Sequence, residues 1–475
     1  MERSSRLPRL RCLGVLVVSA VLAAACASGN RGANPEGSGG VSAAASGSAA
    51  PASQTFGDLP SPCGPGAAKG ATDQGVTDTA INIAYGDDRG FTGSPGLSHE
   101  VGDAVKAMIG WCNEQGGING REIVGKFYDA KITETNNVMT EACASAFMLV
   151  GQGWALDSTG EQTRVNCNLV SVETYSVSPE FANGPMQFEA VPNPADETVG
   201  AFFSQFAKLY PDKVRKAAQY TTTLATENYS NRRGVVTAQQ FGWNWLPCTQ
   251  TVNYFGEPDY KPFMQKLKDC GAEVVWFNLS AGPQLYNALQ AANQVGFHPL
   301  WITETNNYVK GFADFNSNGL ADNVFVRTAY IPMEQADQFP AVKKYIDVVR
   351  ADGGDVSQLG MQATSSFLLW ATAAKKCGST LTRQCMVNEL SKIHDWTGGG
   401  MHAATDPGGN HGPTCGMLLR LQGTKYVQVY PQKTGTFDCS PSYTVKLPAD
   451  FVTVKLNSDR IALNYLTDKA IKPQS

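Results

Sequence analysis

Short apolar runs alternate with longer amphipathic stretches along most of the chain, starting near Thr77. Residues 80–85 form a β-prone run, and 98–114 carry an apolar face that predicts a helix with Ser98 as its cap and Gly116-Gly117 as its end. The face repeats at i, i+3, i+7 and i+10, in Val101, Ala104, Met108 and Trp111.

The same strand-then-helix order continues through two series, the second beginning at Lys213. Such alternation predicts parallel sheets covered by helices, so the fold class is α/β with two doubly wound lobes. The predicted strands are 121–128, 147–151, 169–172, 217–220, 247–254, 273–279 and 300–302, and the predicted helices are 134–144, 158–166, 227–241, 259–269 and 283–295.

After residue 323 the pattern predicts a crossover strand at 324–330 and helices at 337–352, 360–376 and 381–392. Asp406-Pro407-Gly408-Gly409 is a turn signal, interpreted as lying between hairpin-like strands at 417–421 and 426–430. We therefore expect a first lobe of 73–192 plus 327–398, a second lobe of 193–326 plus 399–445, and an extension over 446–475. The hinge is expected near Asn193 and Asn323.

The N-terminus predicts export. Arginines precede an apolar run, Leu13 to Ala25, that is too short to span a bilayer and is typical of a signal peptide over 1–25. Leu22-Ala23-Ala24-Ala25-Cys26 resembles a bacterial lipobox, which implies lipidation of Cys26; ordinary cleavage is the alternative. Residues 26–72 are rich in Gly, Ser, Ala and Pro and predict a flexible tether.

Composition narrows the function classes. Without the signal peptide, 34 basic and 41 acidic residues give a net charge near −7, which disfavours nucleic acid as a partner. Apart from Cys12 and Cys26, ten cysteines remain, an even number that suits disulfides in an oxidising compartment. The spacing lacks the close pairs of a zinc site, so no metal is expected. Sequence leaves the connectivity open, but short separations favour Cys63 with Cys112, Cys143 with Cys167, Cys248 with Cys270, Cys377 with Cys385, and Cys415 with Cys439.

Several motifs carry a family resemblance over about residues 77–432. Gly116-Gly117-Ile118-Asn119-Gly120-Arg121 is the most specific, supported by the loop 86–93, by Tyr128-Asp129 and by Val191-Pro192-Asn193. The chain resembles the branched-chain amino-acid type of periplasmic binding protein. This resemblance implies the type I fold, capture of a small polar solute such as an amino acid or amide by hinge closure, and an ABC importer permease and ATPase as partners.

Loops that follow the strands are where such a fold binds its ligand. In the first lobe the candidates are Arg89, Phe91, Trp154, Ala155, Glu173 and Tyr175, and in the second lobe they are Tyr229, Ser280, Glu304 and Thr305. By the resemblance, Ala155, Tyr175 and Val177 fall near positions where relatives fix an amino acid. We expect the aromatic side chains to stack on the solute, Glu173 or Glu304 to pair with an ammonium, and Arg89 with a carboxylate.

No catalytic constellation stands out. The five histidines include no pair at metal-ligand helical spacing, and neither a nucleophile elbow nor a phosphate loop is present in the sequence. We expect no enzyme activity and no cofactor. The competing hypothesis is a ligand-sensing receptor protein that signals through a partner, because the same fold serves both functions.

Overall fold

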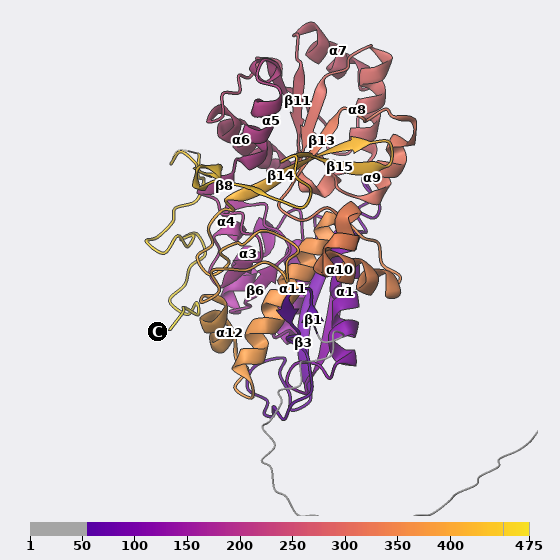
Figure 1. Ribbon diagram of the computed structural model, residues 1–475. Coiled ribbons are helices and arrows are strands. Elements are labelled where there is room, and N and C mark those ends of the chain that lie inside the picture. The colour runs from indigo at the N-terminus through magenta and orange to yellow at the C-terminus, as the bar shows by residue number, and fades with distance from the viewer. Residues whose placement is uncertain (1–54, 450, 475) are drawn as a thin grey trace, which may run out of the picture. The chain divides into compact units, whose positions relative to one another are not determined.

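The computed structural model describes residues 55–449 and 451–474. Residues 1–54 lie outside the described chain, and with them the predicted signal peptide, Cys26 and most of the predicted tether. Within the described residues, no helix has the length and apolar character needed to cross a membrane. Figure 1 shows two lobes, each built around its own sheet.

The first lobe contains a parallel sheet with the strand order β4-β3-β5-β6-β7. Strand β5 is buried at every residue because helices cover both faces of the sheet. The strands are β3 (Ala80–Asp87), β4 (Glu122–Asp129), β5 (Met148–Val150), β6 (Ser171–Glu173) and β7 (Gln187–Glu189).

Helices from two distant parts of the chain cover this sheet: α1 (His99–Glu114), α2 (Thr135–Ser145), α3 (Ser158–Asn166), α4 (Pro179–Ala182), α10 (Pro340–Ala351), α11 (Gln358–Cys377) and α12 (Arg383–Leu390). Helix α11 packs along α1 (Figure 1). The four predicted apolar positions of α1 are all buried, so the predicted face is confirmed. Ser98 is the N-cap residue of α1 as predicted, but its backbone is left-handed (φ 56°) and its side chain makes no cap hydrogen bond.

The second lobe contains a mixed sheet with the order β10-β9-β11-β12-β13-β14-β15, and β16 also pairs with β14. Its first five strands are parallel and its last ones antiparallel. The strands are β9 (Ala217–Thr222), β10 (Gln250–Val252), β11 (Val274–Phe277), β12 (Leu300–Thr303), β13 (Val324–Thr328), β14 (Cys415–Gln422), β15 (Lys425–Tyr430) and β16 (Asp438–Cys439). Its helices are α5 (Ala201–Leu209), α6 (Ala225–Gln239), α7 (Lys261–Asp269), α8 (Pro283–Gln294) and α9 (Lys310–Phe315).

The chain passes between the lobes after β7, after β13, after α12 and again after β17 (Thr444–Lys446). Strand β17 pairs with β8 (Glu197–Val199), so two of these segments lie side by side. The first crossing runs through Asn193 as predicted. The predicted second hinge at Asn323 is wrong, because Asn323 donates to the carbonyl of Pro299 just before β13, inside the second lobe.

The predicted tether extends too far. From Thr55 onward the chain is part of the first lobe, with a small hairpin of β1 (Thr55–Phe56) and β2 (Leu59–Pro60). Phe56 is fully buried, and its ring lies 5.5 Å from that of Trp111. The buried ring of Phe56 and the Cys63–Cys112 disulfide hold this Gly- and Pro-rich stretch in place. Composition alone does not reveal these two contacts.

The C-terminal region differs from expectation in two places. The hairpin turn lies at Gly423 (φ 54°) between β14 and β15, whereas the 406–409 turn lies in the third crossing. The extension after Lys446 returns to the first lobe, where Ala470 is buried in its core and Gln384 donates to the carbonyl of Lys472.

All five predicted cysteine pairs form disulfides: Cys63–Cys112, Cys143–Cys167, Cys248–Cys270, Cys377–Cys385 and Cys415–Cys439. The glycine-rich family motif also has a structural role. Gly117 has φ 69°, and a β-carbon there would lie 1.9 Å from the carbonyl oxygen of Arg121. The guanidinium of Arg121, 1 % exposed, donates to the carbonyls of Thr77, Gly70 and Gly378. The motif therefore holds separate segments of the first lobe together. It does not line the cavity between the lobes.

Candidate functional site

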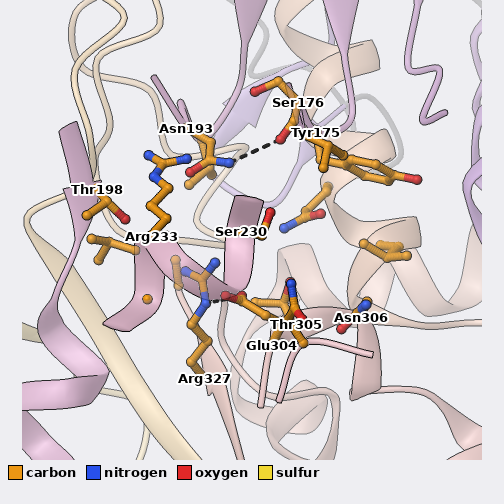
Figure 2. A pocket seen from close by; sticks show the side chains of 18 of the residues that line it. Tyr175, Ser176, Asn193, Thr198, Ser230, Arg233, Glu304, Thr305, Asn306 and Arg327 are labelled. Carbon is orange, nitrogen blue, oxygen red and sulfur yellow. Dashed lines mark hydrogen bonds and ion pairs between the residues drawn. The ribbon is translucent and has the colours of Figure 1, made fainter. Parts of the chain in front are cut away.

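A cavity of about 210 Å³ lies between the lobes and has walls from both. It lies where loops leave the carboxyl ends of the strands, the position at which open α/β sheets bind ligands. Figure 2 shows polar side chains from the two lobes and from the first crossing around it. The polar lining residues include Ser98, Tyr175, Ser176, Glu189, Asn193, Thr198, Thr226, Glu227, Ser230, Arg233, Asn278, Ser280, Glu304, Thr305, Asn306 and Arg327.

The first-lobe wall includes the loop after β6, and Asp157 holds this loop in shape. This carboxylate, 2 % exposed, accepts hydrogen bonds from the backbone N–H groups of Val177 at 2.7 Å and Ser178 at 3.1 Å. Burial raises the pKa of Asp157 to about 7. The position of Tyr175 and Ser176 in the cavity therefore depends on a carboxyl group outside it.

Glu189 connects the cavity to the hinge. Its Oε2 accepts from the Ser176 hydroxyl at 2.9 Å and from the N–H of Asn193 at 3.2 Å, and the Asn193 amide donates back to the carbonyl of Ser176 (Figure 2). Glu173 is its direct neighbour on β6. Burial raises the pKa of both carboxyl groups, and the nearby Glu189 raises the pKa of Glu173 further, which favours the protonated forms.

The second-lobe wall includes an internal ion pair. Nε of Arg327 donates to Glu304, drawn as a dashed line in Figure 2, and the guanidinium lies 5.0 Å from the ring centre of Phe202. These two charges compensate each other before any solute enters. Helix α6 contributes two further charged side chains, Glu227 near its start and Arg233 one and a half turns later.

Half of the predicted ligand residues come together here. Ala155, Tyr175, Ser280, Glu304 and Thr305 all line the cavity. Ser280 accepts from the side-chain amide of Asn306 at 3.0 Å, and Glu304 is the ion-pair partner of Arg327. Their contact with a solute stays a prediction.

Two predicted residues of the first loop lie outside the cavity. Arg89 is bound to Asp87 at 2.7 Å and to Asp103 at 3.0 Å, so its charge is already compensated. Phe91 is buried behind the wall, where its ring stacks 5.3 Å from Tyr254, a lining residue of the other lobe.

Three more candidates are packed elsewhere. Trp154 is 2 % exposed and belongs to a first-lobe core cluster. Glu173 is fully buried beneath Glu189 and does not line the cavity. Tyr229 turns away from the cavity, and its ring lies 5.5 Å from that of Phe451 in the C-terminal extension. Each was chosen for its loop position, and tertiary packing decided its direction.

Sequence reasoning missed the charged side chains that α6 and β13 present to the cavity. Glu227, Ser230 and Arg233 repeat at i, i+3 and i+6 on a helix that was predicted correctly. A polar stripe of this kind usually faces water, so only the position of the first lobe reveals it as a wall. Arg327 is the last residue but one of β13, a strand whose sequence pattern predicts a crossing between the lobes.

Comparison with known proteins agrees with this architecture. A family model described as periplasmic binding protein matches residues 85–425. The chain belongs to this family. No curated protein matches the sequence. The family's fold is thus the one that the glycine-rich motif predicted, and the family consists of solute-binding proteins.

Solved structures with this periplasmic binding protein fold resemble the chain at low identity. A fatty acid ABC transporter substrate-binding protein from Thermomonospora curvata has a TM-score of 0.63 and 17 % identity, and the match covers 77 % of this chain and 98 % of that one. The leucine-binding protein LivK from Thermotoga maritima has a TM-score of 0.61 and 15 % identity, over 74 % of this chain and 97 % of the other. LivJ from Streptococcus pneumoniae, in complex with isoleucine, has a TM-score of 0.58 and 15 % identity, over 74 % and 100 %.

Proposed function

We propose that the protein is an exported binding protein that captures a small polar solute between its lobes and delivers it to an ABC importer. The observation that carries this proposal is the cavity itself, whose walls come from both lobes while a few crossing segments join them. A solute that contacts both walls stabilises the closed arrangement over the open one by its differential affinity.

The solved neighbours support transport as the purpose of this capture. Their names describe substrate-binding proteins for ABC transporters of fatty acids and branched-chain amino acids. These solutes differ in charge and length on one common fold. The fold therefore supports solute capture, with a permease and an ATPase as partners, while the lining residues select the solute.

Export and anchoring complete the proposal. Five disulfides favour an oxidising compartment outside the cytoplasm. A diacylglycerol on Cys26 would attach the protein to the outer face of the cytoplasmic membrane, with the residues up to 54 as the connection. Radiolabelled palmitate incorporation into the full-length chain, compared with Cys26→Ser, tests this anchor.

The test of solute capture is a thermal-shift screen of the mature chain, with its disulfides intact, against amino acids, amides, carboxylates and sugars. A bound solute at 100 times its dissociation constant adds about 2.7 kcal/mol to stability. Small-angle scattering with the best solute should show a smaller radius of gyration, because the lobes close.

A cavity-filling variant provides the control. Ser230→Phe places a large side chain in the cavity and should abolish the thermal shift, whereas Ser145→Phe makes the same change on the exposed end of α2 and should preserve it. A folded protein that shows no shift and no closure with any solute class would contradict the proposal.

A further inference from the structure

Helix α6 presents two side chains of opposite charge to the same cavity, and neither has an ion-pair partner among the described residues. They are Glu227 and Arg233, with Ser230 between them, and all three line the cavity. Figure 2 shows Ser230 and Arg233 beside this space. Six residues of α-helix separate the Cα atoms of Glu227 and Arg233 by about 9 Å along the axis.

The guanidinium of Arg233 is buried and forms no ion pair among the described residues. The residue is 5 % exposed, its Nη2 donates to the backbone carbonyls of Pro194 and Glu197, and its Nε has no acceptor in the described chain. Burial lowers the pKa of Arg233, which reflects the cost of holding this charge away from water. An anionic group of a solute would compensate that charge, as Glu304 compensates Arg327.

The carboxyl group of Glu227 is in the complementary situation. It accepts a hydrogen bond from the Thr222 hydroxyl, and no cation of the described chain forms an ion pair with it. Burial raises its pKa to about 7. Beside it, Asn278 donates to the backbone carbonyl of Glu227 at 2.7 Å, and its own side-chain oxygen is buried with no partner. This end of the cavity therefore offers two acceptors, the carboxyl group of Glu227 and the side-chain oxygen of Asn278.

The space available is longer than this one cavity. A second cavity adjoins it and shares Leu97, Ser98, Ser280, Asn306 and Leu359 with it. An extended solute therefore has room between the lobes, whereas the amine and carboxyl carbon of an α-amino acid lie only about 2.5 Å apart.

We propose that the cleft binds an elongated zwitterion, with an amine at Glu227 and Asn278 and a carboxylate at Arg233. The class includes long-chain ω-amino acids and short peptides with free termini. This inference rests on the proposed function, because it assumes that the cavity captures a solute. Each charged contact would form with a protein group that has no ion-pair partner among the described residues, and hydrogen bonds between charged groups are stronger than those between neutral ones.

Titration calorimetry on the mature chain tests whether the solute is an elongated zwitterion. The protein is first unfolded and refolded without solute, so that any bound molecule is removed. The probes are glycine, γ-aminobutyrate and ε-aminocaproate, together with hexanoate, hexylamine and the amide of ε-aminocaproate. Affinity should rise with the separation of the two charges. Removing the charge at either end should weaken binding at least about tenfold.

A variant locates the amine end. Glu227→Gln keeps the shape of the side chain and should reduce ε-aminocaproate binding at least about tenfold while leaving hexanoate binding unchanged. Glu114→Gln makes the same change on an exposed residue at the end of α1 and should alter neither. Arg233 is left intact because it also holds two carbonyls of the first crossing.

Three outcomes would overturn the inference. The first is tighter binding of glycine or another α-amino acid than of any ω-amino acid, and the second is equal binding of ε-aminocaproate and its amide. In both cases a solute still closes the lobes, so the proposed function stands. Closure on a solute of another class, with none of the zwitterions bound, would also overturn this inference alone.

Discussion

Replacing Asp157 by Asn should change how the stability of this protein depends on pH. Both carboxylate oxygens accept from backbone N–H groups of the loop that forms the first-lobe wall, and the group is almost fully buried. Asn keeps the shape and one acceptor but places an NH₂ group against an N–H donor. We expect Asp157→Asn to cost about 1–3 kcal/mol at acidic pH, where the wild-type carboxyl group is neutral.

The sign of the pH effect follows from the direction of the pKa shift. Folding raises the pKa of Asp157 from an ordinary 3.8 to about 7. The folded state therefore holds a proton that the unfolded chain has lost, and the stability present below pH 4 is lost as pH rises through 7. A shift of this size lowers the free energy of unfolding of wild type by about 4 kcal/mol between acidic and neutral pH, whereas an Asn at this position does not titrate. The cost of the substitution should shrink with rising pH, reverse between about pH 4.5 and pH 6, and become a net stabilisation by pH 8.

Urea unfolding of wild type and variant at pH 4, 6 and 8, followed by tryptophan fluorescence, measures this difference. Comparing the two proteins at each pH cancels the titration of other buried carboxyl groups such as Glu189. If the difference in the free energy of unfolding between wild type and variant stays constant from pH 4 to pH 8, Asp157 has an ordinary pKa. A difference that grows with pH would show that its charged form stabilises the fold, which would refute the reasoning.

Three further predictions follow from contacts elsewhere. Arg121→Met should cost about 3–5 kcal/mol in urea unfolding, because several buried carbonyls lose their donor, and should leave solute affinity in calorimetry unchanged. Replacing Cys63 and Cys112 together by Ser should cost about 4 kcal/mol in the same assay, because the bond closes a loop with a separation of 49 residues. Arg460→Gln should cost about 1–2 kcal/mol at pH 7. Arg460 lowers the pKa of Asp196, so the ion-pair part of that cost should be lost in thermal melts as pH falls through the folded-state pKa of Asp196, below 3.8, while the hydrogen bonds of Arg460 to the carbonyls of Gly409 and Asn410 keep the rest.

The sequence by itself determined the fold class and the order of the elements, and it favoured the disulfide pairs that the structure contains. Periodicity records which face of a helix or strand is buried, and Val101, Met108 and Trp111 of α1 are buried as their spacing predicted. Short separations also favoured pairs such as Cys377–Cys385, which the structure confirms. The same reasoning placed loops at the correct sheet edge, which brought Tyr175, Ser280 and Thr305 to the cavity.

Only the tertiary structure decided which side chains of that edge face the solute space. Loop position does not set side-chain direction, so Trp154 and Tyr229 turned into the packing of their own lobes while Arg89 was bound by neighbouring carboxylates. Charged residues on a helix face water by default, and Glu227 and Arg233 became cavity walls because the other lobe covers them. Periodicity is a local property, whereas a site between two lobes depends on contacts between residues far apart in the chain.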